Sequence, residues 1–167
     1  MKKISYDQQF SRVFEAISGN GAFLTVKALQ RINTMTIGWA TLGYIWNKPI
    51  LMVAVRKSRY TYNLIESSDN FTVSVPFLGK MRDELKFCGT KSGRNYDKFE
   101  ECNLQIKPAH EVESPLITNC DIHYECKIRF KQEMKKNNLD PDFQNKNYPE
   151  NDYHTLYFGE IVNTLKE

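Results

Sequence analysis

An apolar run without a break, Ile50 to Val55, leads directly into a cluster of cations and then into a helical pattern. Side chains alternate between the two faces of a strand, so a strand that is apolar at every position has to be covered on both faces. The helical spacing over residues 59–67 predicts a helix that begins where this strand ends. Ser58, at the junction, is a favourable N-cap residue. The chain must therefore place a helix N-terminus at the end of a buried strand.

The strand–helix junction carries an electrostatic conflict. Three cations, Arg56, Lys57 and Arg59, surround Ser58 at the helix end where the macrodipole is already positive. A bound anion would remove the conflict, because backbone amides, cations and the hydroxyls of Ser58 and Thr61 are groups that bind phosphate. The alternative is that the cations point into water or pair with carboxylates. The junction thus indicates an anion site without identifying the anion.

The remaining segments favour a mostly β chain with inserted helices. Besides the strand at 50–55, residue patterns predict strands at residues 22–29, 34–46, 71–75, 120–131 and 154–165. Helical spacing predicts short helices at residues 6–17, 80–87 and 96–102. Alternation within 120–131 predicts one apolar and one charged face, and the polar stretch 135–152 predicts a surface excursion. This count of strands favours an antiparallel barrel over a doubly wound sheet, and no Gly-x-Gly-x-x-Gly motif is present.

Size and charge restrict the class of protein. The 167 residues fit one domain spanning 1–167. The 23 Lys and Arg residues are interleaved with 20 Asp and Glu residues, which does not favour nucleic acid as a partner. No stretch has the length of a membrane span and no apolar segment follows the N-terminal cations, so we expect no membrane partner and a soluble, cytoplasmic protein. The four cysteines have no repeated spacing and are expected to be free thiols.

Two other segments have the residue types of a ligand site. Asn33 to Thr41 is a strand dense in hydroxyls and small residues around Trp39, and such an edge suits a planar heteroaromatic ligand. An ordinary half-buried strand, rich in Thr because of β-propensity, is the alternative. Phe87 to Arg94 has two glycines, two hydroxyls and two cations. It is either a loop that closes over a ligand or only a helix C-cap with a turn, and its spacing is not that of a P-loop.

Cysteine and histidine positions do not predict a metal site. Cys120 and Cys126 share the apolar face of their strand, whereas His123 lies on the opposite face, so no metal is expected. Cys88 adjoins the glycine loop, where its thiol either contacts a ligand or is buried and inert. His154 stands where the excursion rejoins the last strand, and a surface histidine is the alternative there. No catalytic triad can be identified, so the residues alone leave the catalytic groups unknown.

Four segments, taken in order, resemble one known family. They read Asn-Thr-Met-Thr-Ile-Gly-Trp at 33–39, Val-Arg-Lys-Ser-Arg-Tyr-Thr-Tyr-Asn-Leu-Ile at 55–65, Phe-Cys-Gly-Thr-Lys-Ser-Gly-Arg at 87–94 with Asp97-Lys98-Phe99 after it, and His-Thr-Leu-Tyr-Phe-Gly-Glu-Ile at 154–161. Each segment alone is unspecific, but the ordered set resembles the flavin reductase-like family of split barrels that bind flavin mononucleotide (FMN), and within it the flavoredoxin-like branch. Two features depart from that family. Asn47-Lys48-Pro49 stands where a Pro-Pro pair is common, and residues 132–152, which could alter access to the flavin, match no motif.

The resemblance implies a six-stranded antiparallel split β-barrel that forms a homodimer, with FMN near the subunit interface. By matching positions, the phosphate and ribityl end of FMN would be held by Arg56, Ser58, Arg59 and Thr61. The isoalloxazine ring would be lined by Asn33, Thr34, Met35, Thr36 and Trp39. The pocket would be closed by Cys88, Gly89 and His154, and the position of His154 and Cys88 near the flavin would make these two the candidates for a catalytic role.

The resemblance also implies a redox function. Such an enzyme would accept hydride from NADH or NADPH as a transient co-substrate and pass electrons to free flavin or another acceptor. Because the flavin carries this chemistry itself, no acid–base pair needs to be visible in the sequence. Two alternatives stay open. One is an electron carrier that is served by a redox protein partner and has no NAD(P)H activity of its own; the other is a non-redox module that binds another phosphorylated ring, such as pyridoxal phosphate.

Overall fold

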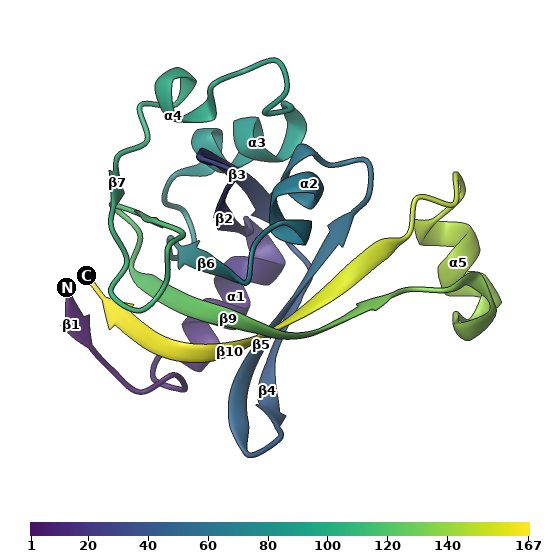
Figure 1. Ribbon diagram of the computed structural model, residues 1–167, viewed down its shortest axis with the longest axis horizontal. Coiled ribbons are helices and arrows are strands. Elements are labelled where there is room, and N and C mark those ends of the chain that lie inside the picture. The colour runs from purple at the N-terminus through teal and green to yellow at the C-terminus, as the bar shows by residue number, and fades with distance from the viewer.

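The computed structural model describes residues 1–167, and one antiparallel sheet dominates it (Figure 1). The strands are β1 Lys2–Lys3, β2 Ala22–Ala28, β3 Arg31–Ile37, β4 Ala40–Ile45, β5 Lys48–Arg56, β6 Asn70–Val75, β7 Ile106–Lys107, β8 Leu116–Ile117, β9 Ile122–Glu133 and β10 His154–Lys166. The helices are α1 Phe10–Gly19, α2 Tyr60–Glu66, α3 Arg82–Thr90, α4 Lys98–Glu101 and α5 Pro141–Asn147, with a 3-10 turn, η1, at Lys136–Asn138.

The main sheet runs in the order β3-β2-β6-β9-β10-β5-β4, and the short β1 pairs with β10 outside this path. The edge strands β3 and β4 follow one another in the chain with only Gly38 and Trp39 between them, so the sheet curls enough to bring the end of β3 near the start of β4. The two strands do not pair, and the sheet stays open. The expected mostly β fold with inserted helices is confirmed. The expected count of six strands is wrong, since the sheet has eight.

The two additional strands have separate origins. Residues 34–46, predicted as one strand, leave one edge of the sheet after Ile37 and enter the other edge at Ala40, which divides them into β3 and β4. At the N-terminus, Lys2 and Lys3 pair with the end of β10. Two charged residues carry no strand pattern, so their pairing is set by β10 and not by their own sequence.

The four predicted helices occur in order as α1 to α4 with shifted ends, whereas α5 and η1 lie in the excursion and were not predicted. α1 begins at Phe10 and not at Tyr6. α3 takes in Gly89 and Thr90, which the sequence places in the following loop, because helical bonding continues until the amide of Lys91 donates to the carbonyl of Phe87. The loop that borders the candidate site is therefore shorter than predicted.

The charged face of β9 is partly buried, contrary to the prediction. His123 and Glu125 are fully buried. The segment between α4 and β9 covers this face, and the amide of His110 donates to the Glu125 carboxylate at 3.1 Å. Only from Lys127 onward is the strand mostly exposed. Alternation of residue types identifies the strand here but not what covers it.

Apolar side chains form two clusters. The larger lies inside the curled sheet against α1 and α2 and includes Phe71 and Tyr157. The smaller includes Phe23 of β2 with Leu85 and Cys88 of α3, and it fixes the helix that borders the candidate site. No helix combines the length and the apolar character that crossing a bilayer requires.

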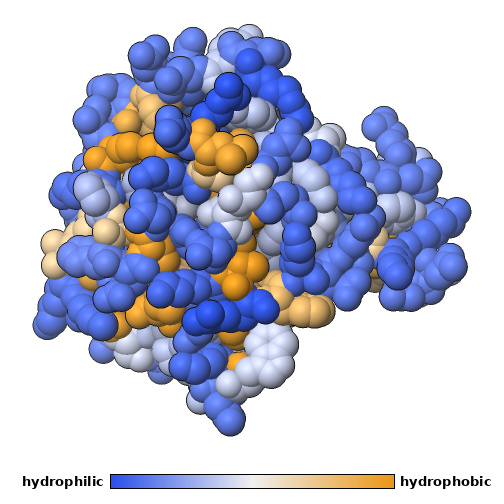
Figure 2. Space-filling view, viewed as in Figure 1, coloured by the Kyte–Doolittle hydropathy of each residue, from blue (hydrophilic) through white to orange (hydrophobic).

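β9 and β10 continue beyond the body of the molecule as an arm that ends in η1 and α5 (Figure 1). The face of this end that Figure 2 shows is mostly hydrophilic, although Phe143 of α5 is an exposed aromatic side chain. The arm contains the predicted surface excursion at 135–152. Among residues 135–152 only Tyr148 is buried, with 4% of its surface exposed.

Candidate functional site

Two adjoining hollows lie where β3 meets the start of α2, one bordered by the end of α3 and the other by β5 and β10. The first, here called the cationic cavity, has a volume of about 110 Å³, and its lining includes Asn33, Arg59, Thr61, Lys91, Arg94 and Lys98. The second, called the tryptophan hollow, measures about 220 Å³ and is lined by Met35, Thr36, Ile37, Gly38, Trp39, Ala54, Arg56, Arg59 and His154. Met35 and Arg59 line both, so the hollows are neighbours.

The charge of the cationic cavity is unbalanced. Four cations line it, Arg59, Lys91, Arg94 and Lys98, and no aspartate or glutamate does. None of the four forms an ion pair elsewhere, since the ion pairs of the molecule involve other residues. Cations grouped without a counter-charge favour the binding of an anion.

Lys98 is the buried member of this group, with 4% exposure. Its Nζ donates to the carbonyl oxygens of Thr34, at 2.9 Å, and of Cys88, at 2.8 Å. Asp97 accepts backbone bonds at the start of α4 and so fixes Lys98 in the first turn. Burial lowers the pKa of Lys98, and the Arg59 charge lowers it further. An ammonium has three donors, of which two are used here, and a buried cation needs an anionic partner to offset its desolvation.

A buried hydrogen bond forms one wall of the cationic cavity. Nδ2 of Asn33 donates to Oγ1 of Thr61 at 2.7 Å. Because the Thr61 oxygen accepts this bond, its own proton stays available to a ligand. Gly93 packs directly against the pair, and a Cβ added there would lie 2.1 Å from Oδ1 of Asn33. Only glycine fits, so the loop after α3 closes onto the cavity.

β3 and α3 are tied together beside this wall. Oγ1 of Thr36 donates to the carbonyl oxygen of Leu85 at 2.6 Å. A Cβ added at Gly89 would lie 3.3 Å from Cβ of Thr36, so the absence of a side chain lets the helix approach the strand closely. These contacts hold α3 against β3, between Gly89 of the cationic cavity and Thr36 of the tryptophan hollow.

The tryptophan hollow has one flat aromatic wall. The rings of Trp39 and His154 lie 4.8 Å apart between centroids, inclined at 44°. Trp39 is 46% exposed, so a large part of its ring is open to a ligand. Met35 and Ala54 add apolar surface and Arg56 adds charge at the edge. This combination suits a planar, partly polar ring.

His154 is a neutral group at this site. Its Nδ1 lies 2.9 Å from the hydroxyl of Tyr148. Burial, with the nearby Arg56 charge as the next cause, lowers the pKa of His154 to about 4. The imidazole therefore offers hydrogen bonds to a ligand near neutral pH and does not serve there as a charged acid.

Arg56 and Ser58 are held by the excursion, contrary to the picture of free anion-binding groups. Arg56 donates to the carbonyl oxygens of Asp152, at 3.0 Å, and Asn147, at 2.9 Å. Oγ of Ser58 donates to the Asp152 carboxylate at 2.6 Å. The predicted capping role of Ser58 is wrong, because this carboxylate takes its hydroxyl and Arg59 becomes the N-cap of α2 without a side-chain bond.

The structure brings together all the predicted binding residues except Thr34, and each of the others lines one or both hollows. Thr34 lies on the opposite face of β3, where its hydroxyl accepts from Thr25 and donates to the Leu24 carbonyl. Sequence reasoning missed Lys98 as a binding residue, although the helix cap Asp97 just before it is a signal that its position is fixed.

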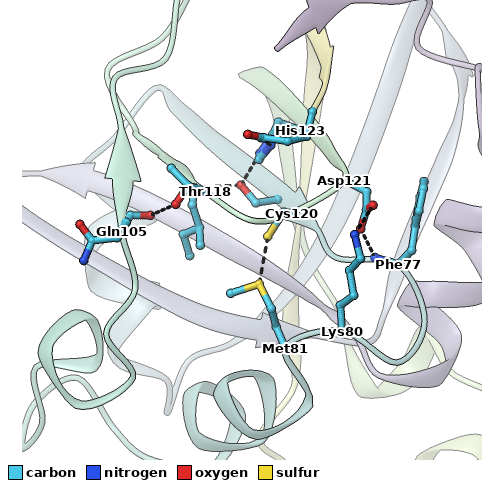
Figure 3. A network of polar contacts seen from close by, with 11 residues as sticks. Phe77, Lys80, Met81, Gln105, Thr118, Cys120, Asp121 and His123 are labelled. Carbon is cyan, nitrogen blue, oxygen red and sulfur yellow. Dashed lines mark hydrogen bonds and ion pairs between the residues drawn. The ribbon is translucent and has the colours of Figure 1, made fainter.

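The cysteines offer no reactive thiolate at the site. Cys88 lines the cationic cavity, but burial raises the pKa of its thiol to about 12. Cys120 is directed at Met81, with 3.7 Å between the sulfurs, whereas His123 contacts the hydroxyl of Ser74 at 3.0 Å (Figure 3). The alternative of a buried, inert thiol therefore fits Cys88 better than a redox role.

A third hollow, of about 230 Å³, lies between α1 and β4 and has an apolar lining that includes Phe10, Phe14 and Leu51. It touches the tryptophan hollow at Gly38. No charged residue lines it, so it does not suit a phosphate.

Three comparisons bear on this arrangement. An uncharacterized protein of Archaeoglobus fulgidus is 29% identical over 140 residues, which are 84% of this chain and 68% of the relative. Flavoredoxin of Desulfovibrio vulgaris (Miyazaki F) superposes with a TM-score of 0.69 at 23% identity, covering 89% of this chain and 70% of that one. Flavoredoxin from Methanosarcina acetivorans gives 0.68 at 25% identity, with 89% and 69% covered.

A wider likeness extends to an NADH:FAD oxidoreductase of Streptomyces globisporus, with a TM-score of 0.66 at 17% identity over 99% of this chain and 87% of that one. These solved structures agree in fold with the curled sheet described above. A model of the flavin reductase-like domain matches residues 15–167, which is nearly the whole chain. The protein therefore belongs to the flavin reductase-like family.

Proposed function

We propose that the protein binds FMN and passes electrons through it as an NAD(P)H-dependent flavin oxidoreductase. One observation carries the proposal: the cationic cavity has four cations and no carboxylate, and it adjoins a hollow walled by Trp39. A phosphate joined to a planar ring matches both parts. Membership of the flavin reductase-like family supports a flavin as that ring.

The phosphate would lie in the cationic cavity. Lys98 would donate its unused proton to it, Arg59 would supply charge at the mouth, and Thr61 would donate from its free hydroxyl. Charge-assisted hydrogen bonds of this kind are about twice as strong as neutral ones. Arg56 and Ser58, both held by Asp152 or its neighbours, would have to exchange partners before they bind phosphate.

The ring would lie in the tryptophan hollow, against Trp39 and Met35. Bound there, FMN would supply the hydride acceptance and electron release that no side chain of this protein supplies. The chain's own part is to orient the ring and to leave one face accessible. His154 stays neutral and contributes a hydrogen bond, so no proton transfer by this residue is required near neutral pH.

Two titrations test binding. FMN and riboflavin are added separately to ligand-free protein, and quenching of flavin fluorescence gives the two dissociation constants. We expect FMN to bind at least about tenfold more tightly, because riboflavin lacks the phosphate. Equal affinities would refute the cationic cavity as the phosphate site. Binding of pyridoxal phosphate in preference to FMN would instead favour the non-redox alternative.

The redox part needs a second experiment. The FMN-loaded protein is mixed with NADH or NADPH without oxygen, and the flavin absorbance is followed. Rapid bleaching supports the reductase, and the faster of the two nucleotides identifies the co-substrate. If dithionite bleaches the loaded protein but neither nucleotide does, the protein is an electron carrier that receives its electrons from a protein partner.

Dimerisation belongs to the same proposal. The exposed rings of Trp46 and Phe130 lie 6.0 Å apart between centroids, and Phe130 lies 5.5 Å from Phe158. Together they form an aromatic surface on the β4–β5 turn, β9 and β10 that is suited to a second copy. Sedimentation of wild type and of Trp46→Ser tests it. A monomeric wild type at micromolar concentration would contradict the dimer without affecting FMN binding by the single chain.

A further inference from the structure

The arm between β9 and β10 contributes one buried residue to the site, Tyr148. Its hydroxyl lies 2.9 Å from Nδ1 of His154 and 3.1 Å from the sulfur of Met134. A phenol has a single proton, and an imidazole nitrogen is a much better acceptor than a thioether. The hydroxyl can donate to the sulfur while it accepts from a protonated Nδ1, or it can donate to an unprotonated Nδ1. The better acceptor favours the second arrangement.

We propose that Tyr148 is a positioning residue that fixes His154 in the tautomer protonated at Nε2, so that the imidazole presents an N–H donor to the ligand in the tryptophan hollow. The identity of that ligand rests on the proposed function. The tautomer itself is a property of the ligand-free chain and can be tested without any flavin.

Nε2 of His154 faces the tryptophan hollow, as its lack of a protein partner indicates. No protein group bonds Nε2 of His154, and it is not among the unpartnered polar atoms that are sealed from solvent. The residue lines the tryptophan hollow. Nε2 is thus the part of the ring that reaches this hollow, where a carbonyl oxygen or an unprotonated ring nitrogen of a ligand would accept its proton.

The position of Tyr148 is itself fixed by aromatic and cationic contacts. The guanidinium of Arg56 lies 5.1 Å from the ring centroid of Tyr148, and Arg56 also bonds the carbonyl oxygen of Asn147. Tyr153 stacks on Tyr148 at 5.1 Å, and Trp39 meets its edge at 6.3 Å. The phenol therefore cannot turn away from the histidine without breaking several contacts.

The charges around His154 keep the ring neutral. Arg56 and Arg59 lower its pKa, in addition to burial, and only Asp152 raises it. A hydrogen bond donated by Tyr148 to Nδ1 stabilises the neutral ring further, because an imidazolium has no acceptor nitrogen. The same tautomer should therefore persist through the whole range around neutral pH.

Long-range proton–nitrogen correlation spectra of the ligand-free, nitrogen-15-labelled protein test the inference directly. His154 is assigned by the signals that disappear in His154→Gln. We expect the pattern of a single tautomer protonated at Nε2. A wild-type spectrum with the proton on Nδ1, or with both tautomers averaged, would overturn the inference, whatever any variant does.

Tyr148→Phe removes only the hydroxyl. We expect this variant to show mixed tautomers and a higher pKa for His154, and to bind FMN about 3- to 10-fold more weakly, as the loss of one oriented hydrogen bond predicts. Tyr153→Phe is the matched control, since the Tyr153 hydroxyl donates to Asn151 and not to the histidine. Unchanged tautomer and pKa in Tyr148→Phe would refute the positioning role.

The two proposals fail separately. If the wild type has the expected tautomer but does not bind FMN, the proposed function is wrong and the role of Tyr148 stands. If FMN binds and is bleached as proposed but Nδ1 of His154 carries the proton, the role of Tyr148 is wrong and the proposed function stands.

Discussion

Nζ of Lys98 donates to the carbonyl oxygen of Cys88 at 2.8 Å, which joins the first turn of α4 to the last turn of α3 at the edge of the cationic cavity. Both partners are buried. The contact satisfies one donor of the ammonium without neutralising its charge. The cavity is therefore built around a cation whose counter-charge must come from a ligand.

Replacing this cation should weaken FMN binding with little change in shape. We expect Lys98→Met to raise the dissociation constant of FMN about 10- to 100-fold, since a hydrogen bond to a charged group contributes about 1.5–3 kcal/mol. Riboflavin affinity should change much less. Lys86→Met, an exposed lysine on α3, is the control. Fluorescence titration gives the dissociation constants of FMN and riboflavin for each variant and for the wild type. An equal loss of affinity for both flavins in Lys98→Met would argue against a phosphate contact.

Lys98 illustrates what the sequence could and could not show about the site. The motifs predicted which segments meet, and β3, the α2 junction, the end of α3 and the start of β10 do lie together. Lysine is rarely buried, so its side chain could not be predicted to lie in a cavity. The capture of Ser58 by Asp152 depends on how the arm returns to the body, which residues 135–152 do not encode locally.

Asp152 competes for groups that the resemblance assigns to phosphate. Its carboxylate accepts from Ser58 and lies 3.9 Å from Nη1 of Arg56. We expect Asp152→Asn to bind FMN about 3- to 10-fold more tightly at low salt, because removing a like charge near the phosphate gains about 1 kcal/mol at a partly exposed site. The gain should shrink as salt is added.

Glu150→Gln provides the matched control for Asp152→Asn. This exposed carboxylate lies two residues away on the same arm, so its loss changes the net charge equally. Equal gains in both variants would indicate a general charge effect. Weaker binding in Asp152→Asn alone would mean that the carboxylate holds Ser58 in place for the ligand.

Gly93 tests the wall of the cavity. A Cβ at this position would lie 2.1 Å from Oδ1 of Asn33 and 2.8 Å from Cδ1 of Tyr60, so Gly93→Ala must displace Asn33 from Thr61. We expect a loss of about 1–3 kcal/mol in the free energy of unfolding, as for other overpacked sites, together with weaker FMN binding.

The control for Gly93→Ala is Gly43→Ala in β4, where an added Cβ meets nothing within 4 Å. Urea unfolding and FMN titration of the two variants are compared. If Gly93→Ala unfolds and binds FMN as the wild type does, the loop does not close onto Asn33 in solution.

The fold, like the site, has parts that the sequence predicts and parts that it does not. Residue patterns predicted β2, β5, β6 and β10 within a few residues, because apolar, β-branched and aromatic residues fill each of them between turn signals. They did not predict that residues 34–46 change sheet edge at Gly38 and Trp39. Both halves of that segment have strand character, and only the passage of the chain from one sheet edge to the other separates them.

His154 should make stability depend on pH. Its pKa is about 4 in the folded chain and about 6.5 when unfolded, so the unfolded state binds more protons between these values. Stability from this group is full above about pH 6.5 and is lost as the pH falls toward about 4, by about 3 kcal/mol at most. The free energy of unfolding, measured with urea, should therefore fall less steeply in His154→Gln than in the wild type as the pH is lowered. Equal slopes in His154→Gln and the wild type would show that His154 is not neutral in the folded chain.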